Sequence, residues 1–243
     1  MIKDIKLLES QFDEKVPEKS VIVVRVDGVG FTKLLHPYKK KAAFDSDHRE
    51  AMILAAVETI KRMSGFLVAY VCSDEISFIM TDMLNEKAQH WFGGRIQKLC
   101  SVIPSSVSVV YSTLMSSYKG KLITGIFDAK VIDLYYGWNP EKYINNRLFN
   151  NLNNQTLQLH TFHFGAKKSQ GLSLHRAQES LFEKEITCDK DFLYGTLIIK
   201  DSGQFQRICP FDIGVGNIGG LISHLVEKKV DEYETKRNSS KSS

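Results

Sequence analysis

The sequence predicts an α+β fold of the ferredoxin type, with its elements in the order β-α-β-β-α-β. A β-branched run at 20–27 is followed by a segment at 47–63 whose apolar residues recur at helical spacing. Two further β-rich runs flank Ser73-Asp74-Glu75 and predict a hairpin. In this topology the first strand lies beside the central hairpin. We therefore expect Asp27, at the end of the first strand, to lie close to Asp74.

The rest of the chain completes this fold and adds a second region. The pattern predicts a helix at 92–115, broken or bent near Pro104, and then a strand at 125–134. Beyond Pro140 it predicts, in order, a helix at 141–160, a helix at 174–183 and a short strand at 193–199. We expect three parts: a catalytic domain at 1–138, a helical appendage with a short strand packed on it at 139–235, and a polar, mobile tail at 236–243.

Composition indicates a globular protein. Of 243 residues, 43% are apolar and 25% charged, which is typical of chains that bury a core. No run approaches the ~20 apolar residues of a membrane span, so no membrane partner is expected. The amino terminus lacks an apolar signal core, and the four cysteines show neither C-x-x-C spacing nor disulfide density. We expect a reducing, cytoplasmic location.

The two acidic turns predict a magnesium site. Mg²⁺ is usually held by one or two carboxylates, a carbonyl oxygen and several waters, and Asp27, the Gly28 carbonyl and Asp74 supply that set for two ions. The alternatives are a turn-capping aspartate at position 27 and an ordinary hairpin tip at Asp74. Glu75 is a further candidate catalytic acid. Strand alternation points it away from Asp74, so an ion pair with a basic residue is equally open.

Phosphate-binding groups are the next candidates. Gly28 and Gly30 would let backbone amides approach a phosphate without an intervening side chain. Arg95 and Lys98 are three residues apart near the start of a helix and could grip a triphosphate, unless they are simply surface cations.

Five segments resemble the tRNAHis guanylyltransferases and their relatives, the 3′-to-5′ nucleotidyltransferases. They are V-R-V-D-G-V-G-F (24–31), A-F-D (43–45), A-Y-V-C-S-D-E-I-S (69–77), F-G-G-R-I-Q-K-L-C-S-V (92–102) and F-D-A-K (127–130). The resemblance implies a polymerase-palm-like fold with two Mg²⁺ ions, and GTP or ATP among the substrates. It also implies attack by a nucleotide 3′ hydroxyl on an activated tRNA 5′ phosphate with release of pyrophosphate, in a homotetramer.

The resemblance also implies roles for individual residues. It gives Asp27, Gly28 and Asp74 as metal ligands and Arg95 and Lys98 as triphosphate-binding cations. The nucleotide-binding set that it implies is Asp27, Gly28, Val29, Gly30, Phe31, Thr32, Lys41, Phe44, Asp45, Ser73, Asp74, Arg95, Lys98 and Asn154. In this set Asp45 could accept a hydrogen bond from a base or ribose donor.

Two positions depart from the family pattern. Ala42 stands in place of a lysine, so Lys41 or Lys40 would have to substitute. Leu152 stands in place of the histidine that eukaryotic guanylyltransferases carry. The second departure favours the bacterial and archaeal branch, which repairs truncated tRNA 5′ ends with any nucleotide opposite a template. Dedicated tRNAHis guanylylation, a palm-type nucleotide cyclase and a non-catalytic RNA-binding module remain alternatives.

Two other patterns are weaker. The G-x-G-x-x-G match at 214–219 lies too near the end of the chain for a dinucleotide-binding βαβ unit. His160, His163 and His175 lack paired cysteines at zinc-finger spacing, which favours core or surface histidines over a zinc site.

Overall fold

A six-stranded antiparallel sheet forms the centre of the protein, with strand order β4-β1-β3-β2-β5-β6. The structure is a computed structural model and describes residues 5, 10–39, 42–134, 139–201 and 203–239. The strands are β1 (Val21–Gly28), β2 (Phe66–Cys72), β3 (Glu75–Thr81), β4 (Phe127–Asp133), β5 (Thr196–Asp201) and β6 (Gln204–Ile208). The first four have the ferredoxin order, so the predicted fold class is confirmed.

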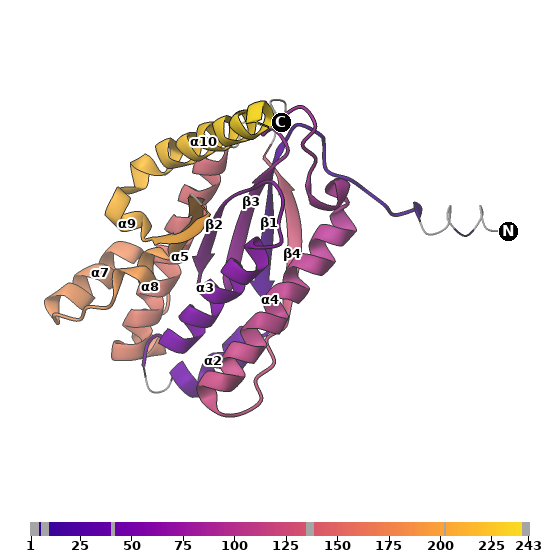
Figure 1. Cartoon of the computed structure of the whole chain (residues 1–243). Helices are drawn as coiled ribbons and strands as arrows, with labels where there is room; N and C mark the ends of the chain where they lie inside the picture. The colour runs from indigo at the N-terminus through magenta and orange to yellow at the C-terminus, as the bar shows by residue number, and fades with distance from the viewer. Residues whose placement is uncertain (1–4, 6–9, 40–41, 135–138, 202, 240–243) are drawn as a thin grey trace.

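Helices cover both faces of the sheet (Figure 1). α3 (Ser46–Ile60) and α4 (Ile96–Lys119) cover one face, and α5 (Pro140–Phe164) and α10 (Ile218–Ser239) cover the other. The shorter helices are α2 (Phe31–Lys39), η1 (Trp91–Gly94), α6 (Ala166–Ser169), α7 (Leu174–Glu183), α8 (Lys190–Tyr194), α9 (Pro210–Ile213) and η2 (Val215–Asn217). Since both faces are covered, β2 and β3 are buried throughout, which explains their nearly continuous apolar sequences.

The C-terminal half shares this sheet. β5 pairs with β2 and β6 pairs with β5, so the region expected as an appendage extends the edge of the sheet. The strand expected at 193–199 begins later, at Thr196, because α8 occupies the preceding residues. α10 continues to Ser239 and therefore includes the first residues of the expected tail, whereas 240–243 lie outside the described residues.

α4 runs without interruption through Pro104, where a break or bend was expected. By length and composition it is the one helix in the described part of the chain that could cross a membrane. Its residues Leu99, Ile103, Val107, Tyr111 and Met115 are buried in the core beneath the sheet. That packing is the one found in core helices of globular domains.

Candidate active site

The structure brings the two acidic turns together at the end of the sheet where β1 ends and β3 begins, which we call the acidic edge. Asp27 lies opposite Glu75 in the β1–β3 register, and the amide of Gly28 donates to the carbonyl of Asp74 at 3.0 Å. Ser73, at the hairpin tip, has a positive φ of 50°, a conformation that non-glycine residues adopt rarely and mostly at functional or tight-turn positions. The predicted proximity of Asp27 and Asp74 is confirmed.

A cavity of about 290 Å³ opens beside these carboxylates, and we call it the acidic cavity. Its sheet side carries Asp27, Ser73, Asp74 and Glu75, and Thr32 lies at the start of α2. Its other wall is a stripe of polar side chains on α5, namely Arg147, Asn151, Asn154, Gln155 and Gln158. The spacing of four, three, one and three residues keeps them on one helix face. Asn154, which the resemblance implied, belongs to this stripe.

Glu75 forms an ion pair instead of standing free at the edge. Arg147 Nε donates to its Oε1 at 2.8 Å, Arg147 Nη2 contacts Oε2, and Arg25 Nε lies 3.6 Å from Oε2. Burial raises the pKa of Glu75, and the Arg147 charge opposes this shift. Of the two roles left open for Glu75, the ion pair is the one that the structure shows, and a carboxylate gripped on both oxygens is poorly placed to bind a metal.

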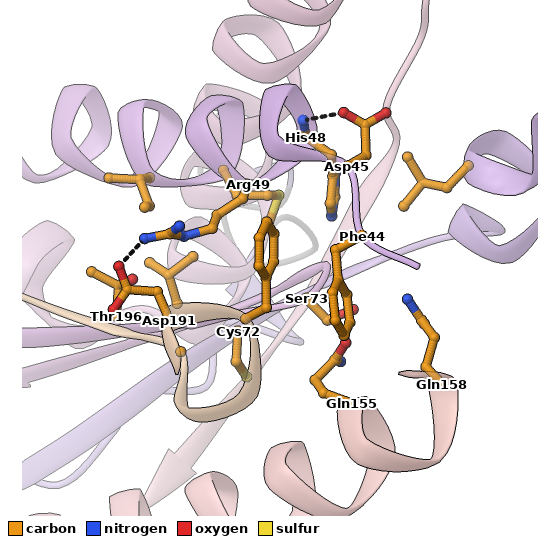
Figure 2. A pocket seen from close by; sticks show the side chains of 16 residues that line it. Phe44, Asp45, His48, Arg49, Cys72, Ser73, Gln155, Gln158, Asp191 and Thr196 are labelled. Atoms are coloured by element: carbon orange, nitrogen blue, oxygen red, sulfur yellow. Dashed lines mark hydrogen bonds and ion pairs between the residues drawn. The ribbon is translucent and has the colours of Figure 1, made fainter. Parts of the chain in front are cut away.

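A second, narrower pocket adjoins the acidic cavity, and we call it the aromatic slot (Figure 2). The rings of Phe44 and Phe192 stack across it with centroids 4.8 Å apart and planes 9° apart. The two pockets share five lining residues, namely Leu35, Cys72, Ser73, Gln155 and Gln158. A polar cavity at the carboxylates therefore continues into a slot with flat apolar walls.

The charged side chains that line the aromatic slot each take part in an ion pair. Arg49 of α3 forms an ion pair with Asp191 of α8, drawn as a dashed line in Figure 2, and its guanidinium lies 5.2 Å from the centre of the Phe192 ring. Asp45 accepts from the amides of Asp47 and His48 as the N-cap of α3, and pairs with Lys119 at 2.8 Å. Asp45 was expected to accept from a nucleotide. Oδ1 accepts from the two cap amides and from Lys119, whereas Oδ2 accepts no hydrogen bond from the described residues, so the contact with a nucleotide stays a prediction.

The end of β1 and the loop after it are more crowded than expected. A Cβ atom at Gly28 would lie 2.4 Å from the Phe31 ring, so Gly28 makes room for a side chain rather than for a phosphate. The amides of Gly28 and Val29 donate to Asp74 and Ile126 carbonyls, and Val29 is exposed outside the acidic cavity. Phe31 is buried in the core and is one of the residues that line the acidic cavity. Gly30 keeps the expected freedom, with a φ of +72° just before α2.

Arg95 and Lys98 do not reach the acidic edge within this chain. Gly94 accepts from the Val16 amide and Ile96 donates to the Glu14 carbonyl, which fixes the start of α4 beside the beginning of β1. β1 rises about 3.3 Å per residue, so its six residue steps from Val21 to Asp27 put these cations roughly 20 Å from the carboxylates. Lys40 and Lys41 lie outside the described residues.

The donor set at the acidic edge fits magnesium. Asp27, Asp74 and the Gly28 carbonyl offer only hard oxygen ligands, which suit Mg²⁺ better than softer metals. Across the described ranges, no three His, Cys, Asp or Glu side chains converge to hold an ion by themselves. In protein magnesium sites, water and substrate phosphates usually supply the other oxygens.

Several residues at this site were not anticipated from the sequence. Arg147, Asn151, Gln155 and Gln158 escaped notice, although their polar stripe on an otherwise core-facing helix was a usable signal. Phe192 comes from a region that no motif marked. Asp128 in F-D-A-K lies directly opposite Asp27 on β4, so its exposed carboxylate shares a sheet face with Asp27.

Known proteins show similarity to this chain over different lengths. An uncharacterized protein of Acanthamoeba polyphaga mimivirus is 27% identical over 149 residues, which are 53% of this chain and 50% of that protein. A tRNA(His) guanylyltransferase of Neurospora crassa is 34% identical over 90 residues, 37% of this chain and 29% of that enzyme. The chain thus spans half or less of these curated relatives.

Solved structures match over most of the chain. A bacterial tRNA(His) guanylyltransferase (Thg1)-like protein in complex with ATP has a TM-score of 0.80 and 25% identity, covering 91% of this chain and 99% of that one. A bacterial Thg1-like protein in complex with GTP (TM-score 0.70, 20% identity, 92% and 97% covered) and the Saccharomyces cerevisiae enzyme (0.66, 21%, 83% and 94%) share the fold. The model of the family described as Thg1, tRNAHis guanylyltransferase, matches residues 2–135, more than half of the sequence, and this chain belongs to that family.

Proposed function

We propose that this protein is a 3′-to-5′ nucleotidyltransferase that adds nucleotides to the 5′ end of tRNA. The observation that carries the proposal is the continuity of the acidic cavity with the aromatic slot. A nucleoside triphosphate has the same division into a polyanionic part and a flat apolar part. The match with Thg1-like proteins in complex with ATP and GTP supports the same assignment.

In this proposal the triphosphate lies in the acidic cavity. Asp27, Asp74 and the Gly28 carbonyl would hold two Mg²⁺ ions, which would supply charge neutralisation and a more acidic attacking hydroxyl. Thr32 and the first turn of α2 lie where a helix N-terminus favours an anion. The nucleotide 3′ hydroxyl would form a new ester bond with the α-phosphate of the tRNA 5′ triphosphate, the bond from that phosphate to the pyrophosphate would break, and the hydroxyl proton would pass to water.

The base would occupy the aromatic slot. With its rings in contact the slot holds only about 40 Å³, so a base enters only when Phe44 and Phe192 separate. Each ring can then stack on one face of the base, and stacking is tolerant of base identity. Arg49 pairs with Asp191 and Asp45 with Lys119, so stacking on the two rings supplies most of the contact with the base. This favours selection by pairing with an RNA template over selection by the protein.

The template-dependent repair role is favoured over dedicated tRNAHis guanylylation on these grounds rather than on Leu152. Position 152 is half-buried and does not line the acidic cavity, whereas Asn151 does. The two activities differ in the nucleotides that they accept, so single-nucleotide reactions separate them.

The test is extension of a tRNA that lacks its first nucleotide and carries a 5′ triphosphate. With magnesium, each of the four NTPs should be added only opposite its complement, and chelation of the metal should abolish addition. Addition of G alone, whatever the template base, would indicate the dedicated guanylyltransferase. Cyclic or linear dinucleotides formed without RNA would indicate the cyclase, and RNA binding without turnover the non-catalytic module.

We also propose a homotetramer, as the resemblance implies. The exposed face of α4 supports association, since Val102 and Val109 are exposed and no charged residue occurs between Lys98 and Lys119. Light scattering should give a mass near four times 27.6 kDa, and a monomer would contradict this part of the proposal.

A further inference from the structure

The acidic cavity holds an imbalance of charge. Of the side chains that line it within the described residues, Asp27, Asp74 and Glu75 are acidic and Arg147 is the only cation. The two cations expected to grip the triphosphate, Arg95 and Lys98, begin α4 at the opposite end of the sheet. Among the described residues, Arg147 is therefore the cation that a triphosphate in this cavity would meet.

Arg147 is built to serve two acceptors at once. Guanidinium carries five N–H donors in a rigid plane, and Glu75 takes one from Nε and one from Nη2. The Arg147 side chain keeps 23% of its surface exposed while lining the cavity, whereas that of Glu75 is only 8% exposed. The ion pair thus fixes the guanidinium in the wall, and the remaining donors are available to a ligand.

Holding the Arg147 guanidinium in place lowers the entropy cost of binding a phosphate. Guanidinium groups form paired, charge-assisted hydrogen bonds to phosphate oxygens, and a group already held in position loses less freedom on binding. Glu75 holds Arg147 in place through two hydrogen bonds. Ser77 adds a further hydrogen bond to Glu75 at 3.3 Å.

We propose that Arg147 binds the β- or γ-phosphate of the nucleoside triphosphate and is the residue of this chain that distinguishes triphosphates from monophosphates. This assignment rests on the proposed function for the location of the nucleotide. It gives α5, a helix outside the ferredoxin core, a direct part in substrate binding.

The test compares GTP with GMP binding in the presence of magnesium and without RNA. Arg147→Gln should lower GTP affinity about 10- to 100-fold, as expected for loss of a charge-assisted contact, and leave GMP affinity within about twofold. Arg147→Lys keeps the charge without the fork and should lose less. Arg176→Gln, on exposed α7, is the matched control and should leave both affinities unchanged. Equal losses for GTP and GMP, or no loss, would overturn the proposal.

A double-mutant cycle separates phosphate binding from support of Glu75. If Arg147 only held Glu75, Arg147→Gln would have no further effect in a Glu75→Gln background. We expect it to lower GTP affinity there as well, and an absent second effect would refute the phosphate contact. The binding test contains no RNA and is therefore independent of the extension assay. If Arg147 shows the expected preference for GTP but the tRNA is not extended, the proposed reaction is refuted and the phosphate contact is not.

Discussion

Aspartates lie at both ends of the central sheet, but those at one end border a cavity and the one at the other end is buried and hydrogen-bonded to the backbone. Asp82, just past the end of β3, is 2% exposed and accepts from the amides of Lys19 and Ser20, each at 2.9 Å. Asp27 and Asp74, at the other end, border the acidic cavity. A carboxylate whose oxygens are taken by backbone donors holds a fold together, whereas carboxylates that face a cavity can bind a ligand.

The far end even brings a serine, a histidine and an aspartate together. Ser20 donates its only hydroxyl proton to the Pro17 carbonyl at 2.7 Å, so His90 Nε2 must donate to Ser20 at 3.0 Å. Asp82 lies 3.4 Å from that same Nε2 rather than on the other ring nitrogen. A catalytic triad needs the serine proton on the histidine and the acid on the opposite nitrogen. This cluster therefore serves structure.

Removing an acid from the cavity should produce the largest effect. Asp27→Asn or Asp74→Asn removes a charge that positions the metal ions, so we expect nucleotidyl transfer to fall by about 10³-fold or more. Because these side chains line the cavity and are not part of the hydrophobic core, the melting temperature should shift by only a few degrees. Single-turnover rates on the truncated tRNA measure the first quantity, and activity within tenfold of wild type would contradict the assignment.

Removing the acid at the far end should produce the reverse pattern. Asp82→Ala leaves the buried amide of Ser20 and the partly buried amide of Lys19 without their acceptor, which should cost about 2–3 kcal/mol of unfolding free energy. Urea denaturation measures this loss. Activity per folded molecule should stay near wild type, and a selective loss of activity would mean that the two ends are coupled.

The glycines after β1 test how tightly the acidic edge is packed. Gly28→Ala places a methyl group against the Phe31 ring and should cost about 1–3 kcal/mol of stability. Gly30→Ala meets open space but a φ of +72°, so it should cost only about 1 kcal/mol. Urea unfolding of the pair gives the comparison, and an equal or reversed order would contradict the predicted crowding at Gly28.

Local patterns and chain order were enough to predict the acidic edge. The β-branched run before Asp27 and the turn residues around Asp74 are short-range signals, and the β-α-β-β order then makes these acids neighbours. Where Arg95 and Lys98 lie also follows from that order. β3 begins at the acidic edge and runs away from it, so the next helix has to start at the far end.

The remaining features depend on contacts between distant segments. The ion pair of Glu75 with Arg147 joins residues 72 positions apart, and the stack of Phe44 on Phe192 joins α3's entry to α8. Pairing of β5 with β2 is similarly non-local. α2 was missed because Pro37 lies inside it and its lysines resemble a loop. None of these contacts leaves a periodic trace in the sequence.

The smallest expected effect is a pH dependence of stability from the far end. Burial lowers the pKa of His90, although Asp82 and Asp133 oppose this shift, so the folded protein binds a proton less readily than the unfolded chain. Unfolding free energy should therefore fall as the pH drops below about 6.5, by roughly 1 kcal/mol at most from this residue. His160, whose pKa is lowered by burial and by Lys168, should contribute in the same direction. Urea denaturation at pH 7.5 and 5.5 should show a smaller difference for His90→Gln than for wild type. Equal differences would mean that His90 gains its proton without loss of stability. Nucleotide binding at the acidic edge should be unaffected by the protonation of His90 or by the His90→Gln substitution.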